Sequence, residues 1–242
     1  FDSAPSDLGV FYAVNKVVGE VESVHCFQAW KGESSGGTME TMFSSVDAKL
    51  TKGGLGKFSL NPENTVSVHQ KKMTNDKIKI KKIPHIGGWT GPFIMALPNT
   101  RVVRRSAALS KKIGKYYGEN FVYSEGAYYS NKGAARKVSI MTLVLGLMIF
   151  SPLRKFLRPF FRKPGEGPSQ EAMDSGFFKS RFLVKTQDGV QAFSMSASGD
   201  PGYKMTSRMA CESALCLSVE DLETLPAVSY THLRAHETWS YL

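Results

Sequence analysis

The chain has little cysteine and fewer acidic than basic residues. Three cysteines in 242 residues are too few and too unevenly spaced for a disulfide framework, which favours reduced thiols in a cytosolic setting. The 31 lysines and arginines exceed the 21 acidic residues, so the formal net charge is +10. The chain opens on Phe1 without a charged-then-apolar leader, so no targeting signal is visible. The 42% hydrophobic content excludes a disordered or fibrous protein and allows a sizeable core.

Several nucleotide, nucleophile and metal motifs are also missing. The glycines at 53, 54 and 56 do not form a phosphate loop, because Thr51 and Phe58 stand where the pattern requires Gly and Ser or Thr. The chain contains neither a dinucleotide fingerprint after a strand nor a nucleophile elbow. The isolated histidines are expected to be structural, and no metal site is predicted. Because these motifs are absent, composition alone does not indicate what the protein does.

The positive charge is concentrated in two clusters. Six lysines and one acid occupy residues 71–82, and the alternation over Lys77–Lys81 predicts a half-buried strand with its lysines facing water. The lysines are typical of a protected edge strand, and a phosphate- or lipid-facing patch is the alternative. Nucleic acid is not expected as a partner, because no aromatic residues interleave with the lysines.

The second cluster follows an apolar segment. Residues 138–150 are almost continuously apolar, but even when counted to Leu153 the segment stays short of a bilayer span. Apolar residues then recur at helical spacing, with basic residues on the other face, before Pro159 interrupts the pattern. This predicts a segment 138–163 that lies on a membrane, with a buried core helix followed by a solvated one as the alternative. The predicted membrane contacts are Leu153, Phe156, Leu157, Phe160 and Phe161.

The remaining patterns predict an α+β fold, an antiparallel sheet with flanking helices. Asp188-Gly189 between alternating runs predicts a hairpin, and Thr38 after the Gly36-Gly37 turn is expected to cap a helix. Cys211 and Cys216 are expected to be core thiols of the last helix. The predicted helices span 10–18, 38–48, 100–117 and 203–217, and the predicted strands span 20–31, 121–130, 177–186 and 190–198.

Several motifs in order resemble the saccharopine-dehydrogenase-like oxidoreductases, which include trans-acting enoyl reductases. FDSAPSDLG at 1–9 and RVVRRS at 101–106 resemble two family segments. The closing pattern of that family is similar to EGPS at 166–169, GFFK at 176–179 and GDPGY at 199–203. The resemblance covers nearly the whole chain to about residue 226.

The resemblance implies a fragment that lacks an N-terminal Rossmann domain. Residues 1–18 would then be the junction, 19–200 the domain that covers the cofactor, and 201–226 a helix that returns to the Rossmann domain. NAD or NADP would be bound mainly by the missing domain, so the fragment alone is expected to be inactive. Residues 227–242 depart from the family, because VSYTHLRAHET at 228–238 resembles a translated sequencing adapter.

The expected function is NAD(P)-dependent reduction of a lipid-like substrate, by a cytoplasmic protein peripheral on a membrane or lipid droplet. The alternative is a non-catalytic membrane- or droplet-associated protein that retains the fold. A lipid surface is the expected partner, and a homodimer is left open. The candidate residues, each of which also has a purely structural explanation, are Asp2 and Ser3 for the cofactor, Gly36, Gly37, Thr38 and Arg104 for the substrate, and Tyr203 as proton donor.

Overall fold

The computed structural model describes residues 3–47, 56–110, 117–152 and 154–219, without the side chains of Ser45 and Leu157. Several predictions therefore lie outside the described residues. They concern the cofactor residue Asp2, the membrane residue Leu153, the side chain of Leu157 and the adapter-like tail 227–242.

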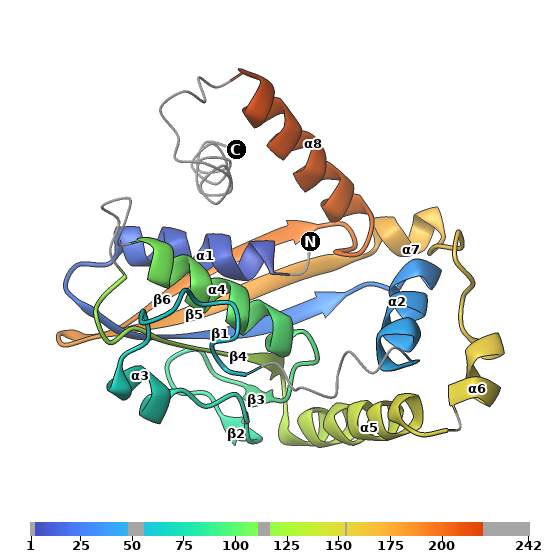
Figure 1. The fold of residues 1–242 in the computed structure, drawn as a ribbon, viewed down its shortest axis with the longest axis horizontal. Coiled ribbons are helices and arrows are strands. Elements are labelled where there is room, and N and C mark those ends of the chain that lie inside the picture. Colours follow the sequence, from blue (N-terminus) through green and yellow to red (C-terminus); the bar gives the residue numbers. More distant parts are fainter. Residues whose placement is uncertain (1–2, 48–55, 111–116, 153, 220–242) are drawn as a thin grey trace.

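One six-stranded sheet forms the centre of the fold (Figure 1): β1 (Val21–Lys31), β2 (Lys81–Lys82), β3 (Trp89–Gly91), β4 (Val122–Tyr129), β5 (Phe177–Thr186) and β6 (Gly189–Ser198). The order across the sheet is β2-β3-β4-β1-β5-β6. β1 and β4 pair in parallel, whereas the other neighbours pair antiparallel. The predicted α+β class is confirmed, but the predicted purely antiparallel sheet is wrong. The long connection between β1 and β4 contains helices and can cross over, as parallel pairing requires.

Helices lie on both sides and at the ends of this sheet (Figure 1). They are α1 (Ala4–Lys16), α2 (Gly36–Asp47), α3 (Val68–Met73), α4 (Ala96–Ser110), α5 (Lys132–Phe150), α6 (Arg154–Leu157), the 3₁₀ helix η2 (Arg158–Phe160), α7 (Gln170–Asp174) and α8 (Lys204–Val219).

The main core lies between one face of the sheet and the helices α1 and α4. Its centre contains Val24 of β1, Tyr123 of β4 and Phe182 of β5, packed against the two helices. A Cβ atom at Gly9 of α1 would lie 2.0 Å from the ring of Phe182. Glycine at this position therefore allows α1 to approach β5 closely. Helix α1 begins six residues before the predicted helix 10–18 and ends two residues before its predicted end.

Local patterns were predicted more accurately than distant pairings. The β5–β6 hairpin turns at Gly189, whose φ of 142° favours glycine, and its strands match the prediction. The predicted strand over Lys77–Lys81 is wrong, because residues 74–80 are extended without ladder pairing and only Lys81–Lys82 joins the sheet. The lysines of this segment are nevertheless exposed, and Ile78 and Ile80 are half-buried.

The apolar segment forms a long and largely exposed helix, α5. The helix has 19 residues because it begins at Lys132, which makes it long and apolar enough to cross a membrane by length and composition. This corrects the prediction that the apolar segment is too short. Only 11% of its most apolar window is buried, so the alternative of a buried core helix is wrong. The exposed stripe on α5 contains Ile140, Leu143, Val144, Leu147 and Phe150.

The basic segment after α5 packs partly on α2. The predicted amphipathic helix is reduced to α6 and η2, with Pro159 in the 3₁₀ turn. Phe156 and Phe160 are exposed, but Phe161 packs edge-on against Phe43 of α2, with ring centroids 5.4 Å apart. Three arginines of this segment form ion pairs with acids in or next to α2: Arg154 with Asp47, Arg158 with Glu40, and Arg162 with Glu33.

The last described helix, α8, projects away from the sheet (Figure 1). Met205 is its one buried residue. The prediction that Cys211 and Cys216 are core thiols is wrong, since Cys211 is exposed and Cys216 is partly exposed. Cys26 of β1 is the buried thiol.

Candidate functional site

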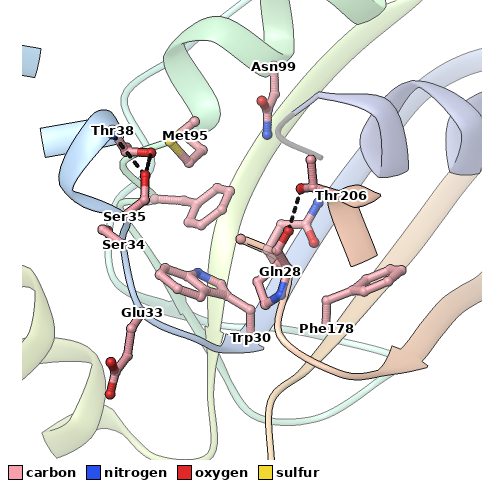
Figure 2. A pocket seen from close by; sticks show the side chains of 13 residues that line it. Gln28, Trp30, Glu33, Ser34, Ser35, Thr38, Met95, Asn99, Phe178 and Thr206 are labelled. Carbon is pink, nitrogen blue, oxygen red and sulfur yellow. Dashed lines mark hydrogen bonds between the residues drawn. The ribbon is translucent and has the colours of Figure 1, made fainter. Parts of the chain in front are cut away.

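A pocket of about 320 Å³ opens at the end of the sheet where β1 finishes and β5 begins (Figure 2). Its wall includes residues from the N-terminal turns of α2, α4 and α8, or from just before them. The aromatic and apolar lining comes from Trp30, Phe93, Met95, Phe178 and Pro201. A largely apolar cavity with a few fixed polar groups is the usual form of a small-molecule site.

Hydroxyl groups lie at the α2 side of the pocket. Ser35 caps α2, because its Oγ accepts the Thr38 backbone N–H at 2.9 Å. The two hydroxyl oxygens of Ser35 and Thr38 also lie 2.9 Å apart, as the dashed lines in Figure 2 show. When Ser35 donates in this pair, the hydroxyl hydrogen of Thr38 is available to a carbonyl oxygen in the pocket.

The cap differs from the predicted one. Helix α2 begins at Gly36, so Gly36 and Gly37 lie inside the helix and Thr38 is not its cap. The Gly36 N–H donates to the Glu166 carbonyl at 3.0 Å, and a Cβ at Gly36 would lie 1.7 Å from the carbonyl oxygen of Lys163. The backbone N–H groups of Gly36 and Thr38 are thus already bonded within the protein. Thr38 contributes to the pocket through its side chain.

Two amide side chains, Gln28 of β1 and Asn99 of α4, form the inner wall of the pocket. Both donate to Oε1 of the buried Glu125 on β4, at 3.1 and 2.9 Å. The Oδ1 atom of Asn99 is buried and has no hydrogen-bond partner among the described residues. A buried acceptor without a donor is costly, so Asn99 is a candidate for binding an N–H or O–H group of a ligand.

Glu125 holds this wall in place. Its Oε1 also accepts the Ser6 hydroxyl at 3.1 Å, and its Oε2 accepts the Tyr123 hydroxyl at 2.9 Å. Burial raises the pKa of Glu125 although these four donors act in the opposite direction. The side chains that Glu125 fixes carry amide and hydroxyl groups. Among the described residues, none that lines the pocket is basic.

The GDPGY segment builds the α8 side of the pocket. Both carboxylate oxygens of the buried Asp200 accept backbone N–H groups at the start of α8, from Tyr203 at 2.9 Å and Lys204 at 3.0 Å. Thr206 lines the pocket one turn later and donates to the Pro201 carbonyl. Tyr203 itself does not line the pocket but lies beside Gly167. Its predicted role as proton donor stays a prediction.

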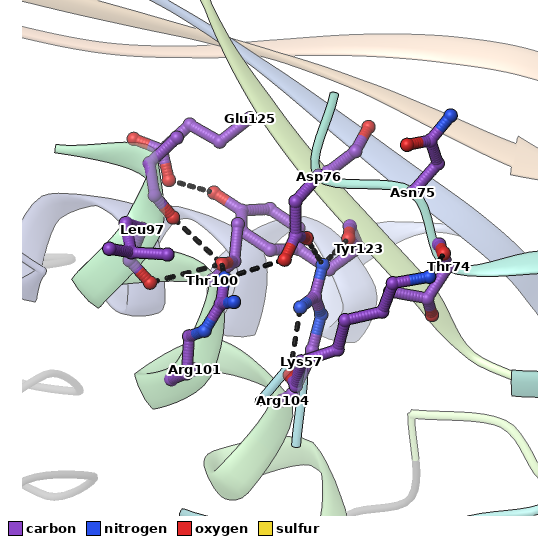
Figure 3. A network of polar contacts seen from close by, with 12 residues as sticks. Lys57, Thr74, Asn75, Asp76, Leu97, Thr100, Arg101, Arg104, Tyr123 and Glu125 are labelled. Carbon is purple, nitrogen blue, oxygen red and sulfur yellow. Dashed lines mark hydrogen bonds and ion pairs between the residues drawn. The ribbon is translucent and has the colours of Figure 1, made fainter. Parts of the chain in front are cut away.

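Arg104 lies in a separate, buried polar network (Figure 3). Its guanidinium donates to Asp76 at 2.6 Å and to the backbone carbonyls of Lys57 and Tyr123, each at 2.9 Å. Arg101 also pairs with Asp76, at 2.7 Å. Although burial opposes it, these two arginines hold the pKa of Asp76 below its usual value. Arg104 thus lies in a buried ion-pair network and does not line the pocket, and its role in substrate binding stays a prediction.

Of the predicted site residues in the described part of the chain, Thr38 alone lines this pocket. Ser3 precedes α1 and makes no side-chain capping bond. Sequence reasoning missed Gln28, Asn99 and Glu125. The signal for Glu125 was present, because it is an acid in the middle of an otherwise uncharged strand.

The chain matches several curated mycobacterial proteins over most of its length. It is 31% identical to one from Mycobacterium tuberculosis and 28% identical to one from Mycobacterium ulcerans, and each match covers 91% of this chain. A Mycobacterium bovis protein is 32% identical over 57% of the chain. The Mycobacterium ulcerans and Mycobacterium bovis proteins are named trans-acting enoyl reductases, and the Mycobacterium tuberculosis protein carries the same name provisionally. This chain is a homologue of such proteins.

The first two matches cover 57% of the relatives, so the chain spans little more than half of their length. No protein-family model matches the chain. No solved structure gives a significant match.

Proposed function

We propose that this chain is the substrate-binding part of an oxidoreductase that reduces a carbon–carbon double bond next to a carbonyl in a lipid-like substrate. The observation that carries the proposal is the apolar pocket with hydroxyls at one wall and the unpartnered Asn99 oxygen at another. The names of the homologues support the reaction class. Membership of the wider saccharopine-dehydrogenase-like family is part of the same proposal.

The lining suits a conjugated acyl group. Saturating the double bond of an enoyl thioester adds a hydride at the β-carbon and then a proton at the α-carbon. Negative charge develops on the carbonyl oxygen of the enolate between these two additions. A hydroxyl donor such as Thr38, at the positive end of α2, would stabilise that oxygen. Trp30 and Phe178 would pack against the flat, apolar part of the substrate.

The described residues do not fit a complete dinucleotide. The pocket is large enough for one ring or a short acyl segment. The β1–α2 connection and the first turn of α2, which border it, contain Gly32, Gly36 and Gly37, but these do not have the spacing of a dinucleotide fingerprint, and the Gly36 N–H is already bonded within the protein. NAD or NADP, which would supply the hydride, is accordingly proposed to bind mainly to other parts of a longer protein. The proposed contribution of this chain is to hold and orient the substrate.

Fluorescence provides a direct test, because Trp30 lies in the pocket wall and is 44% exposed. We expect a trans-2-octenoyl thioester of N-acetylcysteamine to quench the emission of the purified chain in a saturable manner. Thr38→Val removes the proposed donor and is expected to weaken binding about tenfold. Thr41→Val is the matched control, since Thr41 lies on the same helix but outside the pocket lining.

Two results would contradict the proposal. One is the absence of saturable quenching in the wild-type chain, and the other is an equal loss of affinity in both threonine variants. A Trp30→Phe variant that still binds the thioester by calorimetry, but loses the fluorescence response, would confirm that Trp30 is the reporter.

A lipid surface is a second proposal, favoured by the exposed apolar stripe of α5. Leu143 and Leu147 are 62% and 63% exposed, and Phe156 and Phe160 are exposed at the following turn. Apolar side chains grouped in this way are typical of a segment that inserts at an interface. The same surface fits the alternative of a non-catalytic membrane- or lipid-droplet-associated protein.

Vesicle co-sedimentation tests this second proposal. Leu143→Ser with Leu147→Ser is expected to abolish binding to anionic vesicles, because both side chains are exposed and their loss leaves the core intact. Phe161 is unsuitable for the test, since it packs on Phe43. The control is Val68→Ser, which alters an exposed apolar side chain on α3. Unchanged sedimentation of the double variant would refute the surface role of α5.

A further inference from the structure

A second cleft, of about 550 Å³, lies on the sheet face opposite to α1 and α4. Its floor comes from β1, β4 and β5, and includes His25, Ser124 and Leu183. Residues 75–85, which include β2 and the start of the turn that follows it, contribute its other wall. We call it the lysine cleft. It shares no lining residue with the pocket of Figure 2.

The lysine cleft is strongly cationic. Lys77, Lys79 and Lys81 come from the wall formed by residues 75–85 and Lys185 from β5, whereas no acidic residue of the described ranges lines the cleft. Lys185 pairs with Glu22 at 2.6 Å, but the three wall lysines form no ion pair with any described residue. Lysines that only protected a sheet edge would not need to gather around one cavity.

The positive charge of the cleft affects His25 on its floor. The pKa of His25 lies below its usual value because the surrounding protein removes solvent from the ring and because Lys81 repels a further positive charge. Its Nδ1 is hydrogen-bonded to the Ser124 hydroxyl. An anion in the cleft would relieve the repulsion among these groups.

Between the cations the walls are apolar, and one polar group is unpaired. Phe27, Ile83 and Leu183 form a small hydrophobic cluster that borders the cavity. The Oγ1 atom of Thr90 is buried at the cleft without a hydrogen-bond partner among the described residues. Gly126 makes room there, since a Cβ at that position would lie 2.5 Å from this oxygen.

We propose that the lysine cleft binds a phosphate monoester that has an apolar tail. The phosphate would be bound by Lys77, Lys79 and Lys81, and the tail would lie against Phe27 and Leu183. Such a group occurs on soluble organic phosphates and on phosphorylated lipid headgroups. The site is independent of the proposed reductase pocket, because the two lie on opposite faces of the sheet.

Calorimetric titration of the purified chain with octyl phosphate tests this proposal. We expect saturable binding that is tighter than that of inorganic phosphate, and no binding of octyltrimethylammonium. Lys77→Gln with Lys79→Gln is expected to weaken binding at least about tenfold. The matched control is Lys71→Gln with Lys72→Gln, which removes the same charge from exposed positions on α3 that do not line the cleft.

The outcomes separate a soluble organic phosphate from a lipid headgroup as the ligand, and both from a cleft that binds neither. Binding of soluble octyl phosphate that depends on Lys77 and Lys79 supports a free organic phosphate. Binding that is confined to phosphatidic-acid vesicles, with the same dependence, supports a lipid headgroup. Equal losses in both double variants, or no dependence on Lys77 and Lys79 with either ligand, would overturn the proposal. Thioester quenching at Trp30 is expected to stay unchanged in all these variants.

Discussion

Replacing Asp7 by asparagine should stabilise the protein above neutral pH. Asp7 lies on α1 and is buried, and its Oδ2 accepts the hydroxyl of Ser106 on α4 at 2.8 Å. Its Oδ1 has no hydrogen-bond partner among the described residues. Burial raises the pKa of Asp7 from 3.8 to about 6, although the bond from Ser106 acts in the opposite direction.

The size and the sign of the effect follow from this pKa. A rise from 3.8 to about 6 corresponds to a cost of about 3 kcal/mol for ionised Asp7 in the folded state. Between these pH values the unfolded chain releases the proton while the folded protein keeps it. The free energy of unfolding therefore falls as pH rises from about 4 to 6 and stays low above that range.

Urea unfolding of the wild-type chain and Asp7→Asn at pH 4, 6 and 8 tests the reasoning. The variant should match the wild type at pH 4 and should be more stable by up to about 3 kcal/mol at pH 8. Asp188→Asn, in the exposed β5–β6 turn, controls for the loss of one carboxylate. A stability difference that is absent at pH 8, or equal at pH 4 and pH 8, would refute the argument.

Three further substitutions test the packing and the buried networks by urea unfolding. Gly9→Ala should destabilise the protein by about 2 kcal/mol or more, because the added Cβ would overlap the ring of Phe182. Gly146→Ala on α5 is the control and should be neutral or stabilising, because its Cβ would have no atom within 4 Å. Glu125→Ala removes the shared acceptor of four buried donors, of which the Gln28 and Asn99 amides keep bonds of 3.0 and 3.5 Å to the Ser6 oxygen, and should cost about 2–4 kcal/mol; an effect below about 1 kcal/mol would show that the cluster is not tightly held. Asp76→Asn leaves two buried arginines without a counter-charge and should cost about 3–5 kcal/mol, and a neutral result would contradict their assigned role.

Features determined by neighbouring residues were predictable from sequence. The β5–β6 hairpin depends on Asp188-Gly189 and on alternation within each strand, and both are local. The helix at the end of the described chain follows from its own apolar spacing and from the preceding turn. The resemblance to trans-acting enoyl reductases rested on short motifs spread along the chain, and the homologues confirm that part of it.

Features that depend on distant contacts were not predictable in the same way. The parallel pairing of β1 with β4 joins segments about two fifths of the chain apart, which no local pattern specifies. The pocket likewise gathers side chains from three helices and two strands, so Gln28 and Asn99 carry no recognisable spacing. The ion pair of Arg104 could not be foreseen either, because its partner Asp76 lies in a different, loop-rich segment.

Photo-crosslinking tests the central claim about the pocket most directly. A trans-2-enoyl thioester with a diazirine at the end of its acyl chain would be irradiated with the purified chain, and the labelled residues would be mapped by mass spectrometry. The account predicts labels on Trp30, Met95, Phe178 or their neighbours in the pocket wall, and competition by unlabelled thioester. Labels confined to α5, or spread over the surface without competition, would contradict it.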